Sequence, residues 1–239
     1  MRPSSWFSGS GPGVQTPDGC SVDLYREMPY FGELEELRPL LPSGATLLEL
    51  GCGAGRLTRV LLAMGLEVTA VDNAPAMLEA LPAQARAVQS DIETLALAAR
   101  FDVALLASNL VNHPEPATRR AFLAAARRHL GPGGRLFVQR HDPAWLLGAA
   151  AGAESTVGPL TIRVEAVQRT PPRVAMTVRY DTPAGTWRHS FVAEALEEAQ
   201  LEEELAAEGL ARPTWIDRRR RWLSTMAETS GAADRSPAG

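Results

Sequence analysis

The stretch Thr46–Thr58, TLLELGCGAGRLT, constrains the fold of this chain more than any other part of the sequence. It reads as an apolar strand that ends in an acid, followed by three glycines at alternate positions and the opening of a helix. That order places bare backbone and a helix N-terminus at the carboxyl edge of a strand, where an open α/β sheet binds its ligand. The sequence therefore predicts an α/β sheet with a ligand site at this turn.

The spacing of the glycines indicates which kind of ligand the turn takes. Glu49 is followed by glycines at 51, 53 and 55. A dinucleotide-binding turn has the order G-x-G-x-x-G, and its last glycine would stand where this chain has Arg56. A carboxylate at Glu49 would also repel a pyrophosphate. The turn therefore favours a cationic or amino-bearing ligand.

Four more apolar segments follow the turn, at residues 66–71, 85–89, 101–108 and 135–140. Strands of this kind with helices between them predict a parallel sheet. Asp72 ends the second strand, where a carboxylate can accept hydrogen bonds from the two hydroxyls of a ribose. Asp91 and Ile92 end the third strand, where they can meet the amino group and the face of an adenine.

These motifs together resemble those of class I S-adenosylmethionine-dependent methyltransferases, the seven-stranded Rossmann-like family, over roughly residues 47–138. The resemblance implies S-adenosylmethionine as cofactor. Its methionyl part would lie among Glu49 and the glycines, its ribose on Asp72, and its transferable methyl near the end of the fourth strand. The cofactor-binding residues implied in this way are Tyr25, Glu49, Gly51, Cys52, Gly53, Gly55, Asp72, Asn73, Met77, Asp91, Ile92, Ser108 and Asn109.

The same resemblance implies the architecture, a three-layer α/β fold around a seven-stranded, mostly parallel sheet. A C-terminal antiparallel hairpin would complete the sheet with residues 214–217 and 221–226. An insert at about 155–193 is rich in β-branched residues and predicts three strands, at 160–168, 173–180 and 186–192. In the resembling family such an insert forms an antiparallel β cap over the active site of enzymes that act on amines, sugars and natural products.

The regions outside the glycine turn set the expected organisation of the chain. Residues 1–21 are rich in Gly, Ser and Pro, which predicts a flexible N-terminus. Residues 22–228 are expected to form the methyltransferase domain, and residues 229–239 are expected to be a disordered tail. In the family an N-terminal aromatic segment often closes over the cofactor. Tyr25, Tyr30 and Phe31 either form such a lid or pack on the domain surface as apolar anchors. Helices are predicted at 32–41, 57–64, 116–130 and 196–208.

Composition excludes several kinds of chemistry and partner. All 24 basic residues are arginine, so Schiff-base and lysine nucleophile chemistry are absent. A net charge of −4 argues against broad nucleic-acid binding, and the basic run at 218–221 favours a solvated turn over an RNA contact. Cys20 and Cys52 lack the partners for a disulfide framework or a zinc site. Without a leader-like or membrane-spanning segment, the sequence predicts a cytoplasmic location and no membrane contact. No metal is expected, and the chain is expected to be a monomer or a homodimer.

Two histidines are the candidate catalytic residues. His113 follows the fourth strand and His141 the fifth, so both stand at the ligand-bearing edge of the predicted sheet. An imidazole is suited to remove a proton from a hydroxyl or an ammonium at neutral pH. The alternative is that both rings only satisfy carbonyl groups of their loops.

The sequence thus predicts methyl transfer to an oxygen, nitrogen or carbon of a small metabolite, with natural-product biosynthesis as one setting. Two other functions stay open. The bound cofactor could serve a non-transfer reaction such as a cyclisation, or the turn could hold a nicotinamide cofactor in a reductase, against which the glycine spacing argues.

Overall fold

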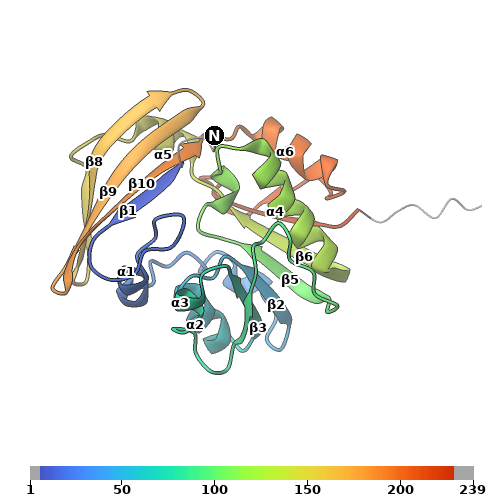
Figure 1. Ribbon diagram of the computed structural model, residues 1–239. Coiled ribbons are helices and arrows are strands. Elements are labelled where there is room, and N and C mark those ends of the chain that lie inside the picture. The colour runs from blue at the N-terminus through green and yellow to red at the C-terminus, as the bar shows by residue number, and fades with distance from the viewer. Residues whose placement is uncertain (1–5, 229–239) are drawn as a thin grey trace, which may run out of the picture.

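The computed structural model describes residues 6–228 and contains two sheets, a main sheet of seven strands and a cap sheet of five (Figure 1). The predicted tail at 229–239 lies outside the described residues. The main sheet has the order β11-β12-β6-β5-β2-β3-β4. Its strands are β2 (Thr46–Leu50), β3 (Glu67–Asp72), β4 (Arg86–Gln89), β5 (Phe101–Leu106), β6 (Leu130–Gln139), β11 (Thr214–Trp215) and β12 (Trp222–Met226).

The pairing of these strands confirms the predicted fold class. From β4 to β6 all neighbours run parallel, whereas β12 is antiparallel to β6 and β11 is antiparallel to β12. The last two strands are the predicted C-terminal hairpin. A parallel sheet brings the carboxyl ends of its strands to one edge, so the loops after β2, β3, β4, β5 and β6 gather there.

Helices cover both faces of the main sheet and complete three layers. Leu47 packs with Leu61 of α2 on one face, whereas its neighbour Leu48 packs with Leu123 of α4 and Leu205 of α6 on the other. Successive strand residues point to opposite faces, so an apolar run of this kind needs a helix on each side. The helices are α1 (Val22–Glu27), α2 (Arg56–Ala63), α3 (Pro75–Leu78), α4 (Pro116–His129), α5 (Pro143–Gly148) and α6 (Glu198–Ala207), with 3-10 helices η1 (Arg38–Leu40) and η2 (Leu110–Asn112).

The helix predicted at residues 32–41 is wrong. This segment forms turns followed by the short 3-10 helix η1, which contains Pro39. Leu34 and Leu37 are nevertheless fully buried. Pro39 has no backbone N–H to donate, which disfavours a regular helix at this point. The two leucines reach the core from turns instead.

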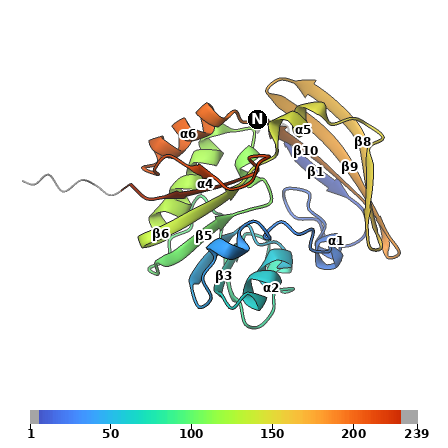
Figure 2. The same ribbon diagram turned by 180° about the vertical axis from the view of Figure 1, so that it is seen from behind.

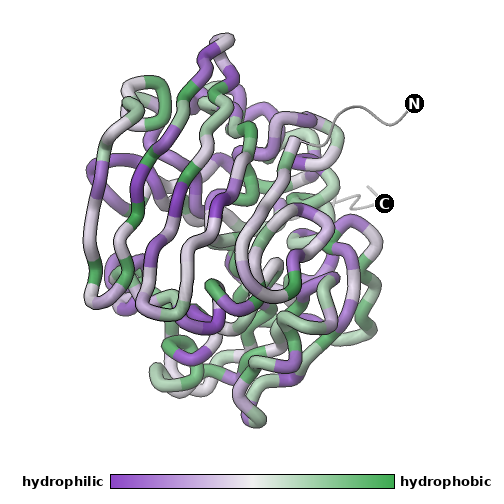
Figure 3. The backbone as a smooth tube through the Cα atoms, turned by 60° about the vertical axis from the view of Figure 1, so that its left-hand side comes forward, coloured by the Kyte–Doolittle hydropathy of each residue, from purple (hydrophilic) through white to green (hydrophobic). Residues whose placement is uncertain are grey.

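The cap sheet forms the second body of the molecule and has the order β1-β10-β9-β8-β7, with every pair antiparallel (Figure 1). The three predicted strands are confirmed, and two more join them. Along the cap strands hydrophobic and hydrophilic residues alternate, as Figure 3 shows. The strands are β1 (Phe7–Ser10), β7 (Glu154–Val157), β8 (Leu160–Thr170), β9 (Arg173–Thr182) and β10 (Gly185–Glu194).

The expectation of a flexible N-terminus is wrong for the described part of residues 1–21. Phe7–Ser10 forms β1, which pairs with β10 along the edge of the cap sheet. The indole Nε1 of Trp187 on β10 also donates to the carbonyl oxygen of Pro12 at 2.9 Å. An edge strand offers unpaired backbone groups to any extended segment that reaches it, so a glycine-rich stretch can be ordered by a partner far away in sequence.

The described residues also bear on membrane and metal binding. Within residues 6–228, none of the helices has both the length and the apolar character that a bilayer crossing requires. In the same part of the chain, His, Cys, Asp and Glu side chains do not gather in threes that could hold a metal ion.

Candidate active site

The glycine turn between β2 and α2 presents backbone to the carboxyl edge of the main sheet. Gly51 and Gly53 have φ angles of +73° and +53°, a region that side chains other than glycine seldom adopt. A Cβ atom at Gly51 would lie 2.5 Å from Leu110, and one at Gly53 would lie 3.4 Å from the ring of Tyr25. Leu110 and Tyr25 therefore pack directly on this turn, which we call the cradle, and Leu110 is a neighbour that the sequence did not reveal.

Asp72 closes this cradle from the end of β3. Its Oδ2 accepts the backbone N–H of Gly53 at 2.9 Å, and its Oδ1 accepts that of Ala74 at 2.9 Å. Burial raises the pKa of Asp72, and these two hydrogen bonds oppose the rise. Each carboxylate oxygen has two lone pairs, so Asp72 can still accept hydroxyl donors from a ligand.

Glu49 lies beneath the turn rather than on its surface. The residue is 2% exposed, and its Oε2 accepts the hydroxyl of Thr58 at 2.6 Å. Burial raises the pKa of Glu49 to about 7, although Thr58 and Arg56 oppose the rise. The carboxyl group therefore titrates far above the usual range of a glutamate, and a nearby positive charge would favour its ionised form.

Residues at the ends of β3 and β4 form the side of the site predicted to hold an adenine. Asn73 Nδ2 donates to Asp91 Oδ1 at 2.9 Å. Ile92 is buried, with its Cδ1 atom 3.7 Å from the position of a Cβ on Gly51. Met77 is also buried, in a small cluster that includes Ala54 of the glycine turn. The predicted residues thus surround the same turn.

Helix α1 lies between the cap sheet and the glycine turn. Its Leu24 packs with Trp187 of the cap, whereas its Val22 packs with Met77 near the turn. Tyr25 contacts both groups, and its hydroxyl lies 3.3 Å from the Sγ of Cys20. Cys20 and burial together raise the pKa of Tyr25. Of the three predicted lid residues, the structure places Tyr25 over the turn.

The other two aromatic residues of that segment lie elsewhere. The hydroxyl of Tyr30 accepts the N–H of Leu34 at 2.9 Å and donates to Glu35 at 3.0 Å. Phe31 is exposed, and the guanidinium carbon of Arg56 lies over its ring, 5.3 Å from the ring centroid. Both residues follow the surface-anchor alternative.

Cys52, another predicted cofactor-binding residue, is buried inside the glycine turn, and burial raises the pKa of its thiol.

The loop after β5 has an unusual backbone at two predicted site residues. Ser108 and Asn109 have φ angles of +55° and +59°. The N–H of Ser108 donates to the side-chain oxygen of Gln139, which ends β6, at 2.8 Å. Non-glycine residues in this region cost free energy and concentrate at functional sites.

His113 and His141 both lie where the carboxyl edge of the main sheet meets the cap. The His113 ring is 5.3 Å from that of Phe7 on β1, and the His141 ring is 6.4 Å from that of Phe191 on β10. Phe7 and Phe191 are paired neighbours in the cap sheet. Asn112 connects the two regions, because its Oδ1 accepts the N–H of His141 at 2.8 Å and its Nδ2 donates to the carbonyl of Glu194 at 2.7 Å.

The two imidazoles differ in their chemical state. Nδ1 of His113 accepts the N–H of Glu115 at 3.1 Å. A backbone amide only donates, so the neutral ring carries its proton on Nε2 and presents a donor. Burial lowers the pKa of His113 and lowers that of His141 to about 4. His141 is therefore neutral at pH 7 and able to accept a hydrogen bond.

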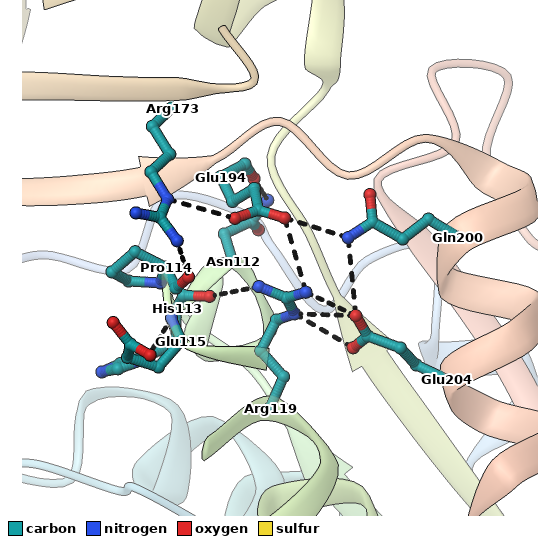
Figure 4. A network of polar contacts seen from close by, with 9 residues as sticks. All are labelled: Asn112, His113, Pro114, Glu115, Arg119, Arg173, Glu194, Gln200 and Glu204. Atoms are coloured by element: carbon teal, nitrogen blue, oxygen red, sulfur yellow. Dashed lines mark hydrogen bonds and ion pairs between the residues drawn. The ribbon is translucent and has the colours of Figure 1, made fainter. Parts of the chain in front are cut away.

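A buried polar network holds the loop that carries His113 (Figure 4). Arg119 of α4 is fully buried, and its Nη1 donates to the carbonyl of His113 at 2.8 Å. Its guanidinium also contacts Glu204 of α6, at 3.0 Å from Nε, and Glu194 at the end of β10, at 3.4 Å from Nη2. Arg119 was not among the predicted residues, although an arginine on the apolar stripe of Phe122, Leu123 and Ala126 is a readable signal.

The family comparison matches residues 47–134 to a model described as a methyltransferase domain. Cypemycin N-terminal methyltransferase from Streptomyces sp is 35% identical over 129 residues, which cover 52% of each chain. Ubiquinone biosynthesis O-methyltransferase from Xanthomonas axonopodis pv. citri (strain 306) is 35% identical over 148 residues, 57% of this chain and 60% of that protein. The chain thus spans between about half and two thirds of these curated relatives.

The structural comparison supports the fold. The structure of CalS10 with bound S-adenosylmethionine, an amino pentose methyltransferase from Micromonospora echinaspora, superposes with a TM-score of 0.63. The sequence identity is 23%, and the match covers 84% of this chain and 92% of that one. The likeness extends beyond the glycine turn to most of the described chain.

Proposed function

We propose that this chain, whose residues 47–134 match a methyltransferase domain, is a class I S-adenosylmethionine-dependent methyltransferase that methylates a nitrogen or oxygen atom of a small molecule. The observation that carries the proposal is the packing of the cap sheet on the edge that holds the glycine turn, with His113 and His141 between them. An acceptor bound there would be enclosed, which favours a metabolite over a large polymer. Relatives named as an N-terminal methyltransferase and as an O-methyltransferase support an amine nitrogen and an oxygen as acceptor atoms.

The residues around the turn fit S-adenosylmethionine. The turn at Gly51 and Gly53 offers backbone groups to the methionyl part, and Asp72 has lone pairs free for two ribose hydroxyls. When bound, the cofactor supplies an electrophilic methyl group on a positively charged sulfur. The remaining task of the protein is to align the acceptor with that methyl and to accept its proton where one must leave.

The two histidines would divide this task. The ring of His141 is neutral and makes no hydrogen bond within residues 6–228. We infer that this ring accepts a hydrogen bond from the molecule to be methylated. His113 would donate from Nε2 and orient it. A pKa of about 4 makes His141 a weak base, so the arrangement suits an amine with a free lone pair better than a group that needs a strong base.

The test of the function is release of S-adenosylhomocysteine across a panel of amines, phenols, sugars and peptide-like metabolites. We expect turnover with at least one amine, and a loss of about 10²-fold or more in kcat for His141→Ala. Affinity for S-adenosylhomocysteine should not change in this variant or in His113→Ala, because neither ring contacts the glycine turn. Cofactor turnover with every acceptor absent would favour a non-transfer reaction, and binding of a nicotinamide cofactor instead would contradict the proposal.

A second prediction concerns pH and Glu49. Below a pH of about 7 the buried carboxyl is protonated, and binding of a cation beside it would favour ionisation. Affinity for S-adenosylmethionine should therefore rise with pH up to about 7, with release of a proton below that value. In the free protein the same raised pKa lowers the free energy of unfolding as pH increases from the usual range of a glutamate toward about 7.

Calorimetry in buffers of different ionisation enthalpy would measure the proton release, with Glu49→Gln as the matched variant. Gln keeps the shape of the side chain and an oxygen for Thr58, but it does not titrate. The variant should bind with no proton release from this position. Equal release from both proteins would mean that another group titrates.

A further inference from the structure

A pocket of about 600 Å³ lies away from the glycine turn, between the start of α5, the start of α6 and the loop that joins β11 to β12. In Figure 2 this loop, in dark red, reaches toward α5. Four arginines line the pocket, Arg140 and the run Arg218, Arg219 and Arg220. The sequence favoured a solvated turn for this run, which leaves the pocket beside it unexplained.

Arg140 forms part of the pocket wall and is an unusual buried cation. The residue is 3% exposed. Its Nε donates to the carbonyl of Arg220 at 2.8 Å, its Nη1 donates to that of Leu196, and its guanidinium lies 4.4 Å from the ring centroid of Trp215. Within residues 6–228 it has no ion pair, and its Nη2 has no hydrogen-bond partner. Burial lowers the pKa of this guanidinium.

Arg119 shows what a compensated buried arginine looks like in this protein. It is as deeply buried as Arg140, but two carboxylates, those of Glu194 and Glu204, contact its guanidinium. Taking a cation out of water without a counter-charge is costly, so buried arginines are as a rule paired. Among the described residues no carboxylate lies within ion-pairing distance of Arg140, and Glu197, Asp142 and Asp217 raise its pKa only as more distant charges. The space next to its guanidinium is therefore open to a negative charge from a ligand in the pocket.

The charges at the pocket rim agree with this interpretation. Arg220 is paired with Glu198, and the carboxylate of Asp142 caps α5 by accepting the N–H of Ala144 at 2.9 Å. Arg218 and Arg219 are exposed, and neither has an ion pair within residues 6–228. Of the acidic residues in the lining, only Glu197 is not used in one of these contacts. Three guanidinium groups of the lining, those of Arg140, Arg218 and Arg219, are therefore outside ion pairs, against the two carboxylates of Glu197 and Asp142.

We propose that this pocket binds an anionic group, a phosphate or a carboxylate, with Arg140 in its wall and Arg218 and Arg219 closing over it. Planar guanidinium groups bind such oxygens in pairs of hydrogen bonds, and several can share one anion. The proposal does not rest on the methyl-transfer function, because none of the cofactor residues lines this pocket. The anionic group can belong to the methyl acceptor or to a separate ligand, since Arg140 directly precedes His141 in the chain.

The test is calorimetric titration of the full chain with inorganic pyrophosphate. The pocket variant is Arg218→Gln/Arg219→Gln, which changes two exposed side chains and leaves Arg140 in place. The control is Arg86→Gln/Arg120→Gln, which removes the same charge from exposed positions on β4 and α4 outside the pocket. We expect binding by the unmodified protein and by the control, and a dissociation constant about tenfold higher in the pocket variant.

Three results would overturn the proposal: no binding by the unmodified protein, equal binding by the pocket variant, or an equal loss in the control. Affinity for S-adenosylhomocysteine should be the same in all three proteins, so a failure here is distinct from a failure of the methyltransferase assignment. In the methyl-transfer assay, competition between pyrophosphate and the acceptor would place the anionic group on the acceptor. Binding without competition would indicate a separate ligand.

Discussion

Replacing Arg119 with leucine is expected to lower the free energy of unfolding by about 3 to 5 kcal/mol, the cost of leaving buried charges without their partner. Glu194 and Glu204 would then lack the guanidinium that neutralises them, and the carbonyl of His113 would lose its donor. Burial alone would lower the pKa of Arg119, but the two glutamates raise it overall, so the cation is part of the folded state. Urea unfolding followed by circular dichroism would measure the change.

Arg120→Leu is the matched control for this prediction. It is the next residue on α4 and is exposed, so its loss should change the free energy of unfolding by at most about 0.5 kcal/mol. Adding Glu204→Leu to Arg119→Leu should restore part of the stability, because one unpaired carboxylate is removed. A stability of Arg119→Leu equal to that of the control would show that the network contributes nothing to folding.

Asp72→Ala is expected to weaken the binding of S-adenosylhomocysteine by roughly 5- to 150-fold, which corresponds to about 1 to 3 kcal/mol. The variant loses the acceptor proposed for the ribose hydroxyls. It also loses the acceptor for the N–H of Gly53, so the cradle itself becomes less well ordered. Calorimetry on the folded variant would measure the affinity.

Glu67→Ala serves as the control for Asp72, because Glu67 is an exposed acid at the other end of the same strand. Its removal should leave the affinity unchanged. If Asp72→Ala also binds with unchanged affinity, Asp72 does not contact the cofactor, and the orientation of the ligand in the cradle must be different.

The comparison of sequence and structure shows which features a local pattern can reveal. The five parallel strands of the main sheet follow from apolar runs bounded by turns, and the glycine turn follows from spacing within a dozen residues. The C-terminal hairpin that completes the sheet was implied by the family resemblance. The chain order also places Asp72, Asp91 and Ser108 at the ends of their strands. For the parallel strands β2 to β5 this is enough to bring them to one edge, because parallel strands share a direction.

Other features depend on contacts between segments that are distant in sequence. The strand Phe7–Ser10 exists because β10 offers it an edge, although its own composition suggests a flexible segment. Glu49 bonds to Thr58 inside the core, whereas its position before the turn suggested a place facing the ligand. His113 presents a donor because the N–H of Glu115 occupies its Nδ1.

The sequence by itself determined the class of fold, the place of the glycine turn and the acids at the ends of the strands beside it, because periodicity and glycine spacing act over a few residues. Only the tertiary structure decided which residues lie between the main sheet and the cap, how their protons are placed and which buried charges have partners. Those properties depend on burial and on neighbours such as Glu204 for Arg119 or Phe191 for His141, and no local pattern encodes the distance between segments that meet only when the chain folds.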